Sequence, residues 1–174
     1  MTLQRILPKG IYQDRLVRAG NRVIDFGWSS NIIVDRCRYL LAAFMKGDTS
    51  IGIQTLKVGR GLESWDSISP ESPTRIIEQL TDPSPIDIPI GSSQIEYLDA
   101  TGKSTPGPTQ RLRITLTFDA GTPPIPSGKT SYPLREFGLF GLFGTEEYMI
   151  DYVRHPVIHK QADDILDRAI HLIF

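Results

Sequence analysis

The chain has 174 residues, of which 40% are apolar and 22% are charged, and its formal net charge is −1. This length fits one domain with a sizeable core, the composition excludes a disordered chain, and the charge argues against a generally basic nucleic-acid binder. The single cysteine, Cys37, excludes an intramolecular disulfide framework, and without a long apolar run or an apolar leader we expect no transmembrane helix and no signal peptide.

The first residues predict a β-hairpin. Residues 3–30 read as extended segments with a turn at residues 19–21, and Val23, Ile24 and Phe26 follow that turn. A glycine and an asparagine in the turn supply the backbone freedom that a tight connection needs.

A helix is predicted next, near residues 32–45. Its apolar side chains recur at helical spacing, at Ile33, Cys37, Leu40, Leu41 and Phe44. Ser30 or Asn31 can cap its start, and Gly47 can end it. We expect this to be the one long helix of the chain.

A strand at residues 51–58 leads into a proline-rich loop region at about residues 62–92. One short helix at residues 74–80 would interrupt this region, with Ile76, Ile77 and Leu80 facing inward. Pro83, Pro85 and Pro89 argue against a central strand there.

The second half of the chain predicts a sheet. Its clearest strand covers residues 111–118, where apolar and polar side chains alternate. Other expected strands lie at residues 93–98, 134–143, 148–154 and 166–174. The fold class that follows is α+β, in one domain over residues 1–174: a mainly antiparallel β sheet or sandwich with one helix.

Two glycine motifs resemble nucleotide-binding loops only in part. Gly102, Lys103 and Ser104 end like a phosphate loop, but Tyr97 stands where its first glycine belongs, so we expect an exposed turn. Gly59 and Gly61 lack the third glycine of a dinucleotide motif and predict a tight turn after a strand. We therefore expect no bound cofactor.

Catalytic and metal-binding patterns are also weak. His155 and His159 are four residues apart, but Pro156 disfavours a helix through them, which favours a solvated loop over a metal site. Cys37 lies on the apolar helix face, where we expect a buried, inert thiol. Ser29 and Ser30 lack the glycine that a nucleophile elbow requires. We predict no catalytic and no metal site.

Glycines also punctuate the apolar run at residues 138–144, which repeats Gly-Leu-Phe. We interpret this run as a strand whose glycines allow close packing or a bulge.

Several segments together resemble a class of phage tail proteins. They are Leu134 to Phe140 (LREFGLF), Tyr148 to Ile150, the His155 to Lys160 segment and a closing strand that ends at Phe174. The opening half agrees, with Asn31 to Val34 before a helix and Leu56 to Gly61 after it. The resemblance covers residues 23–61 and 111–174 and does not extend to residues 62–92.

This resemblance implies a structural, non-enzymatic component of a phage tail, collar or baseplate, or of a related injection machine. Such a part would dock neighbouring tail or baseplate proteins, form a homo-oligomer within a virion assembled in the host cytoplasm, and bind neither membrane nor nucleic acid. A head-decoration or neck protein is the alternative, with Arg15, Arg18 and Arg22 as its candidate basic patch. A small hydrolase and a carbohydrate-binding module, the latter with Tyr148 and Tyr152 on one strand face, rank below both.

Aromatic side chains dominate protein interfaces, so we expect interface anchors in exposed loops at Trp65 and Tyr132. Ordinary core packing is the other reading of both residues. For Arg135 and Glu136 we favour a role in strand pairing over ligand binding.

Overall fold

The computed structural model describes residues 8–67 and 71–174, and within them it contains one α-helix and ten β-strands. The strands form one antiparallel sheet in the order β4-β3-β8-β9-β2-β1-β10-β7-β5-β6. Three short 3-10 helices, at Ala19–Asn21, Glu63–Asp66 and Ser92–Gln94, lie between them. The strand bounds are β1 Lys9–Arg18, β2 Arg22–Ile33, β3 Ser50–Gly59, β4 Ile86–Pro89, β5 Ile95–Leu98, β6 Ser104–Thr105, β7 Arg111–Phe118, β8 Tyr132–Phe143, β9 Glu146–Lys160 and β10 Ile165–Ile173.

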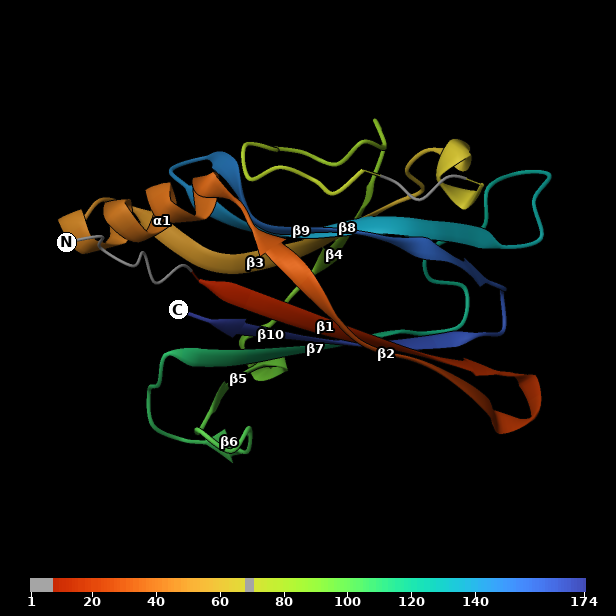
Figure 1. Cartoon of the computed structure of the whole chain (residues 1–174), viewed down its shortest axis with the longest axis horizontal. Coiled ribbons are helices and arrows are strands. Elements are labelled where there is room, and N and C mark those ends of the chain that lie inside the picture. The colour runs from red at the N-terminus through yellow and green to blue at the C-terminus, as the bar shows by residue number, and fades with distance from the viewer. Residues whose placement is uncertain (1–7, 68–70) are drawn as a thin grey trace.

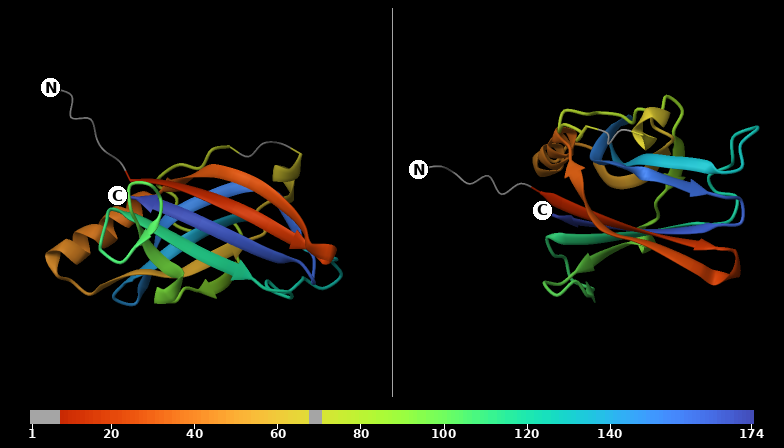
Figure 2. Two further views of the ribbon diagram at one scale, coloured as in Figure 1. Left: turned by 90° about the horizontal axis from the view of Figure 1, so that it is seen from below. Right: turned by 45° about the vertical axis from the view of Figure 1, so that its right-hand side comes forward.

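The sheet curls so that its two halves face each other, as Figures 1 and 2 show. Strands β4, β3, β8 and β9 form one half, and β1, β10, β7, β5 and β6 form the other. Strand β2 belongs to both, because residues 22–31 pair with β1 while Ile32 and Ile33 pair with Tyr152 and Asp151 of β9. The prediction of a mainly antiparallel sheet is confirmed, and the sandwich and the single domain stay predictions.

The core fills the space between the two halves. One cluster of buried side chains joins Leu56 and Leu139 from the first half to Leu16 and Ile114 from the second. The rings of Tyr12 and Phe137 meet edge to face across it, with centroids 5.1 Å apart. The alternation at residues 111–118 places Ile114, Leu116 and Phe118 in this core, as predicted.

The single helix, α1, runs from Asp35 to Lys46 and covers the end of the first half. Gly47 ends it at φ 82°, as predicted. Its predicted caps are wrong, because Ser30 and Asn31 lie within β2 and Val34 occupies the cap position without a side-chain hydrogen bond. Pairing of β2 with its neighbours keeps these residues extended.

The proline-rich region has less regular structure than predicted. Residues 74–80 contain a turn instead of a helix, and their backbone crosses the outer face of β8 and β9. Residues 86–89 form β4, which pairs only with β3 at the edge of the sheet, so the prolines exclude a central strand but not this one. The predicted hairpin is confirmed for residues 9–30, β2 continues to Ile33 where a helix was predicted, and residues 3–7 lie outside the described residues.

Candidate functional site

The most extensive polar network lies where the proline-rich segment crosses the outer face of β8 and β9. At its centre is the carboxylate of Glu136, which is completely buried. Glu136 accepts hydrogen bonds from the backbone N–H of Thr81 at 3.0 Å and of Asp82 at 2.6 Å, and from the hydroxyl of Tyr152. Burial, and then the hydrogen bond to Glu136, raises the pKa of Tyr152 to about 12. The network therefore fixes a loop backbone to the sheet.

Two arginines extend this network along the loop. Asp82 accepts hydrogen bonds from the backbone N–H of Arg60 at 2.8 Å and from its Nε at 3.0 Å. Burial alone would raise the pKa of Asp82, but the hydrogen bonds from Arg60 and Ser84 outweigh it and hold that pKa below its ordinary value. Arg135 grips both carboxylate oxygens of Asp66, each at 2.7 Å. We call this whole set, from Glu136 to Asp66, the loop clamp.

Trp65 lies beside the loop clamp, and an interface role for it stays a prediction. Its ring is half-buried and carries the guanidinium of Arg154 at 4.8 Å from the ring centroid. Gly61 makes room for it, since a Cβ at Gly61 would lie 2.4 Å from the Trp65 ring. Arg135 and Glu136 both form hydrogen bonds of the loop clamp. The sequence predicted a role in strand pairing for them and not these contacts.

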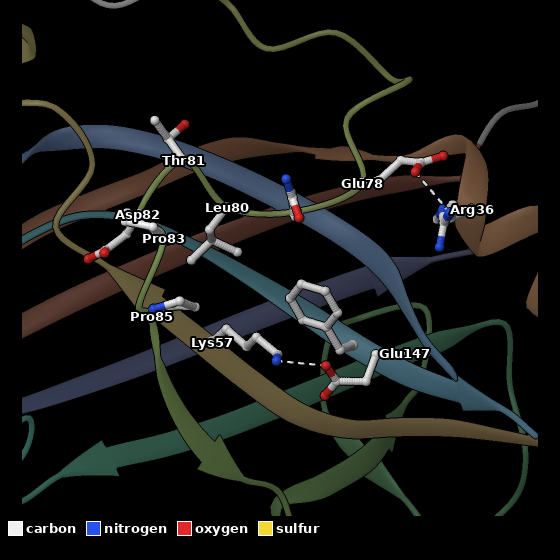
Figure 3. A pocket seen from close by; sticks show the side chains of 11 residues that line it. Arg36, Lys57, Glu78, Leu80, Thr81, Asp82, Pro83, Pro85 and Glu147 are labelled. Carbon is white, nitrogen blue, oxygen red and sulfur yellow. Dashed lines mark hydrogen bonds and ion pairs between the residues drawn. The ribbon is translucent and has the colours of Figure 1, made fainter. Parts of the chain in front are cut away.

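A cavity of about 690 Å³ adjoins the clamp between the loop, α1, β3 and β8 (Figure 3). Lys57 lies within it, with its ammonium 2.7 Å from Glu147 and 5.1 Å from the centroid of the Phe140 ring. Arg36 and Glu78 form a second ion pair at 2.8 Å. Every charged side chain that lines the cavity has a partner of opposite charge. A polar ligand would therefore meet ion pairs in this cavity.

A second cavity, of about 530 Å³ and mostly apolar, opens at the α1 end of the molecule. It lies between α1, β3, β5 and β7 and is lined in part by Leu41, Phe44, Ile51 and Tyr97. These four side chains are also exposed, and the neighbouring Met45 is 83% exposed. We call these five residues the α1 patch. The predicted helix face is therefore only partly buried, with Cys37 and Leu40 inside and Leu41 and Phe44 at the surface.

The thiol of Cys37 is buried, as predicted. Burial raises its pKa to about 11, which keeps the sulfur protonated and unreactive at neutral pH.

Between the two halves of the sheet lies a fully buried ion pair. Arg168 donates from Nε and Nη2 to the two carboxylate oxygens of Asp14, at 2.7 and 2.8 Å, and its guanidinium stacks 3.8 Å from the centroid of the Phe137 ring. The remaining nitrogen, Nη1, has no hydrogen-bond partner. His155 adjoins the pair, with Nε2 at 3.4 Å from Arg168 Nη2. Burial, and then the charge of Arg168, lowers the pKa of His155 to about 4.

The predicted loop around His155 and His159 is wrong, because β9 continues through Pro156 to Lys160. A bulge makes this possible: four steps along β9, from Arg154 to Ile158, face two steps along β8. His155 is buried while His159 is exposed and lies 3.1 Å from the hydroxyl of Ser131. Within residues 8–67 and 71–174, no three His, Cys, Asp or Glu side chains gather closely enough to hold a metal ion.

A further buried carboxylate marks the point where β2 joins β9. Asp151 accepts hydrogen bonds from the Leu139 backbone N–H at 2.7 Å and from Nδ2 of Asn31 at 2.6 Å. Complete burial outweighs both bonds and raises its pKa to about 7. Asp151 did not stand out in the sequence, and Asn31 did so only as a helix-cap candidate and as part of the resemblance.

Tyr132 is not in an exposed loop, because it begins β8 and is only 3% exposed. Burial raises its pKa to about 12. Core packing therefore describes Tyr132, and an interface role for it stays a prediction. Tyr152 is also buried, so it does not form an exposed aromatic platform with Tyr148.

The Gly102 turn and the Gly-Leu-Phe strand have the local structures that we expected, whereas Gly59 ends β3 and residues 60–62 do not form the predicted tight turn. Gly102 occupies an exposed turn at φ 83°, tied to Asp99 through the Thr101 and Lys103 backbone N–H groups. Gly61 follows β3 at φ 54°. In the Gly-Leu-Phe run, a Cβ at Gly141 would lie 2.6 Å from the carbonyl oxygen of Gly52, so close packing is confirmed.

Comparisons with protein-family models, with curated proteins and with solved structures find no match for this chain. In the described part of the chain, the helix is too short to cross a membrane.

Proposed function

We propose that this protein is a structural, non-enzymatic component of a phage tail, collar or baseplate, or of a related injection machine, and that it works by docking neighbouring subunits. The observation that carries the proposal is the α1 patch, in which Leu41, Phe44, Met45, Ile51 and Tyr97 stand exposed around an apolar cavity. Contiguous exposed apolar surface is typical of protein interaction sites. Phe44 and Met45, at 70% and 83% exposure, are its most accessible members.

The loop clamp also supports a docking role. It holds the proline-rich segment against the sheet through buried hydrogen bonds to Glu136 and through the Arg135–Asp66 pair. A loop that is already ordered loses less conformational entropy when a neighbour binds to it. The LREFGLF segment that carries the resemblance to phage tail proteins supplies both anchoring side chains, Arg135 and Glu136.

The predicted sandwich belongs to the same proposal. Strands β3, β8 and β9 would form one layer and β1, β10 and β7 the other. The proline-rich segment crosses the outer face of the first layer, so the outer face of the second layer would be available to a neighbour. In a ring of copies, the α1 patch of one copy would meet the sheet of the next, as in other closed assemblies of identical subunits.

Quantitative mass spectrometry of purified particles from the source tests this function. We expect the chain at a fixed ratio to the tail-tube subunit, at about six or twelve copies per particle if it forms a baseplate or neck ring. A much larger copy number would indicate head or tube decoration. Absence of the chain from intact particles would refute the proposal.

A further inference from the structure

Residues 22–31 of β2 form a sheet edge that no strand of the described residues pairs with on one side. These residues pair with β1 on the other side, and only Ile32 and Ile33 of β2 pair with β9. In the ranges that the structure describes, no other strand pairs with that free side. Figure 2 shows β2 leaving the half that contains β9 and running down to the hairpin beside β1 alone.

The two outer edges of the sheet are protected, whereas this internal edge is not. β4 has four residues and ends at Pro89, and β6 has two residues and is followed by Pro106. Short strands and prolines are the usual protection against added strands. The β2 edge is ten residues long, and a bulge at Phe26 and Gly27 interrupts its pairing at one point only.

Exposed apolar side chains accompany the free backbone of β2. Val23 and Phe26 are 47% and 46% exposed, whereas the Trp28 ring, 47% exposed, packs on His171 of β10 with the ring centroids 4.6 Å apart. A peptide that adds to a sheet edge gains affinity from main-chain hydrogen bonds and specificity from side-chain contacts along the strand. The β2 edge offers both.

The strand opposite this edge leaves room for a partner. β2 and β9 pair only where Ile32 and Ile33 face Tyr152 and Asp151. Residues 153–160 of β9 pair with β8 alone, so the two strands separate from there on. A cavity of about 140 Å³ opens there, lined by residues of three strands: Tyr12 and Asp14 of β1, Phe26, Gly27 and Ser29 of β2, and His155, Pro156 and Ile158 of β9. It can take a side chain from an added strand.

The charge around the edge indicates what kind of strand fits. Arg15, Arg18 and Arg22 lie at the hairpin end. Arg15 has two carboxylates nearby, Asp25 at 3.8 Å and its cross-strand partner Asp167 of β10, whereas Arg22 has no ion-pair partner among the described residues. Arg18 and Arg22 are direct cross-strand partners, an arrangement that like charges disfavour. The Nε of Arg18 is buried without a hydrogen-bond partner, while its Nη2 donates to the carbonyl oxygen of His159 in β9 at 3.4 Å. An acidic side chain beside Arg22 would relieve this repulsion.

We propose that the free edge of β2 binds an extended segment of another protein chain, which adds as an antiparallel strand and places acidic side chains beside Arg22. The inference rests on the proposed docking function and names the chemistry of one docking partner. Because the added strand runs antiparallel to β2, its acidic residues lie at its C-terminal end.

Synthetic nine-residue peptides test this inference on the full chain. One alternates threonine and valine and ends in two aspartates, and its matched control ends in two lysines. We expect the acidic peptide to slow amide hydrogen exchange of residues 22–31 at least tenfold and to bind at least fivefold more tightly than the lysine peptide. Arg22→Glu should reverse this preference, whereas Arg111→Glu, in β7, should leave it unchanged.

N-methylation of the acidic peptide separates strand addition from other binding. Methyl groups on one set of alternate residues face β2 and should abolish binding, while methyl groups on the other set face away and should change affinity less than threefold. Equal losses for the two sets, or no protection of β2 by either unmethylated peptide at millimolar concentration, would overturn the inference. Protection that grows with protein concentration without peptide would assign the edge to a second copy and overturn the stated partner.

The outcome is independent of the test of the proposed function. A chain that is present in particles but does not protect its β2 edge with peptide would retain the function and lose this inference. A chain that binds the peptide but is absent from particles would retain the strand-binding edge and lose the proposed function.

Discussion

The interior of the curled sheet and its outer face each contain an arginine that donates two hydrogen bonds to one aspartate. The pairs are Arg168 with Asp14 inside and Arg135 with Asp66 outside. Inside, the side chains of Arg168 and Asp14 are 0% and 1% exposed, and one guanidinium nitrogen has no partner. Outside, the side chains of Arg135 and Asp66 are 5% and 34% exposed, and a third guanidinium nitrogen donates to the carbonyl of Arg60 at 2.8 Å.

The difference shows what each pair contributes. Removing two charges from water costs several kcal/mol each, and their attraction offsets that cost only while both remain. The interior pair therefore adds little net stability, although the loss of one partner is severe. The outer pair loses less hydration and joins a loop to a strand, so its effect is local.

Breaking the interior pair should give the largest effect. Arg168→Met leaves Asp14 charged and buried without a partner, and we expect a loss of about 3–5 kcal/mol in the free energy of unfolding. Adding Asp14→Leu should restore most of that loss, because no buried charge remains. Urea denaturation of the single and double variants measures both. If the double variant is no more stable than Arg168→Met, the interior pair contributes more than this account allows.

Breaking the loop clamp should give a smaller and more local effect. Glu136→Gln keeps the shape of the side chain but removes one acceptor oxygen from the Thr81 and Asp82 backbone, at a cost of about 2 kcal/mol. We expect faster tryptic cleavage after Arg75 and faster amide exchange at residues 80–82. The matched control is Glu147→Gln, a partly exposed ion-pair partner of Lys57, which should change stability by less than about 1 kcal/mol. Unchanged cleavage in Glu136→Gln would show that the clamp does not hold the loop.

The interior also contains two buried groups with opposite pH dependence. Folded Asp151 has a pKa near 7 against an ordinary 3.8, so it retains a proton that the unfolded chain releases, and its contribution to stability grows as pH falls from 7 toward 4. Folded His155 has a pKa near 4 against an ordinary 6.5, so only the unfolded chain takes up a proton, and stability is lost over pH 6.5 to 4.

Asp151→Asn removes the first contribution and leaves the second. Between pH 7 and 5, we expect the stability of this variant to fall relative to the unsubstituted chain by about 1 kcal/mol per pH unit. Denaturation midpoints at pH 7, 6 and 5 measure the difference. Parallel pH profiles for the two chains would contradict the buried, raised pKa of Asp151.

Local patterns predicted much of the fold where the structure depends on near neighbours. The alternation at residues 111–118 and the glycine that ends α1 are two such cases. Pairing between distant segments decided the rest. Ser30 and Asn31 remain in β2 because of their pairing with β1, although both are good helix caps, and β9 passes Pro156 because a bulge accommodates it. Residues 74–80 do not form the predicted helix. They lead directly into Thr81 and Asp82, whose backbone N–H groups bond to Glu136 of a distant strand.

The candidate site was harder to predict for the same reason. Glu136 meets backbone groups 54 and 55 residues away, which no local pattern shows. One signal was present: the charged residues Arg135 and Glu136 interrupt an otherwise apolar strand, and buried charges in a strand require partners. The partner loop was the proline-rich region that the resemblance did not cover.

Competition between two forms of the chain during particle assembly tests the central claim most directly. Cells would express the unsubstituted chain and the Leu41→Ser/Phe44→Ser variant in equal amounts, and mass spectrometry would measure their ratio in purified particles. Ile76→Ser, which changes an exposed isoleucine outside the α1 patch, is the control. We predict at least fivefold depletion of the α1 patch variant and equal incorporation of the control. Equal incorporation of both forms would contradict docking through the α1 patch.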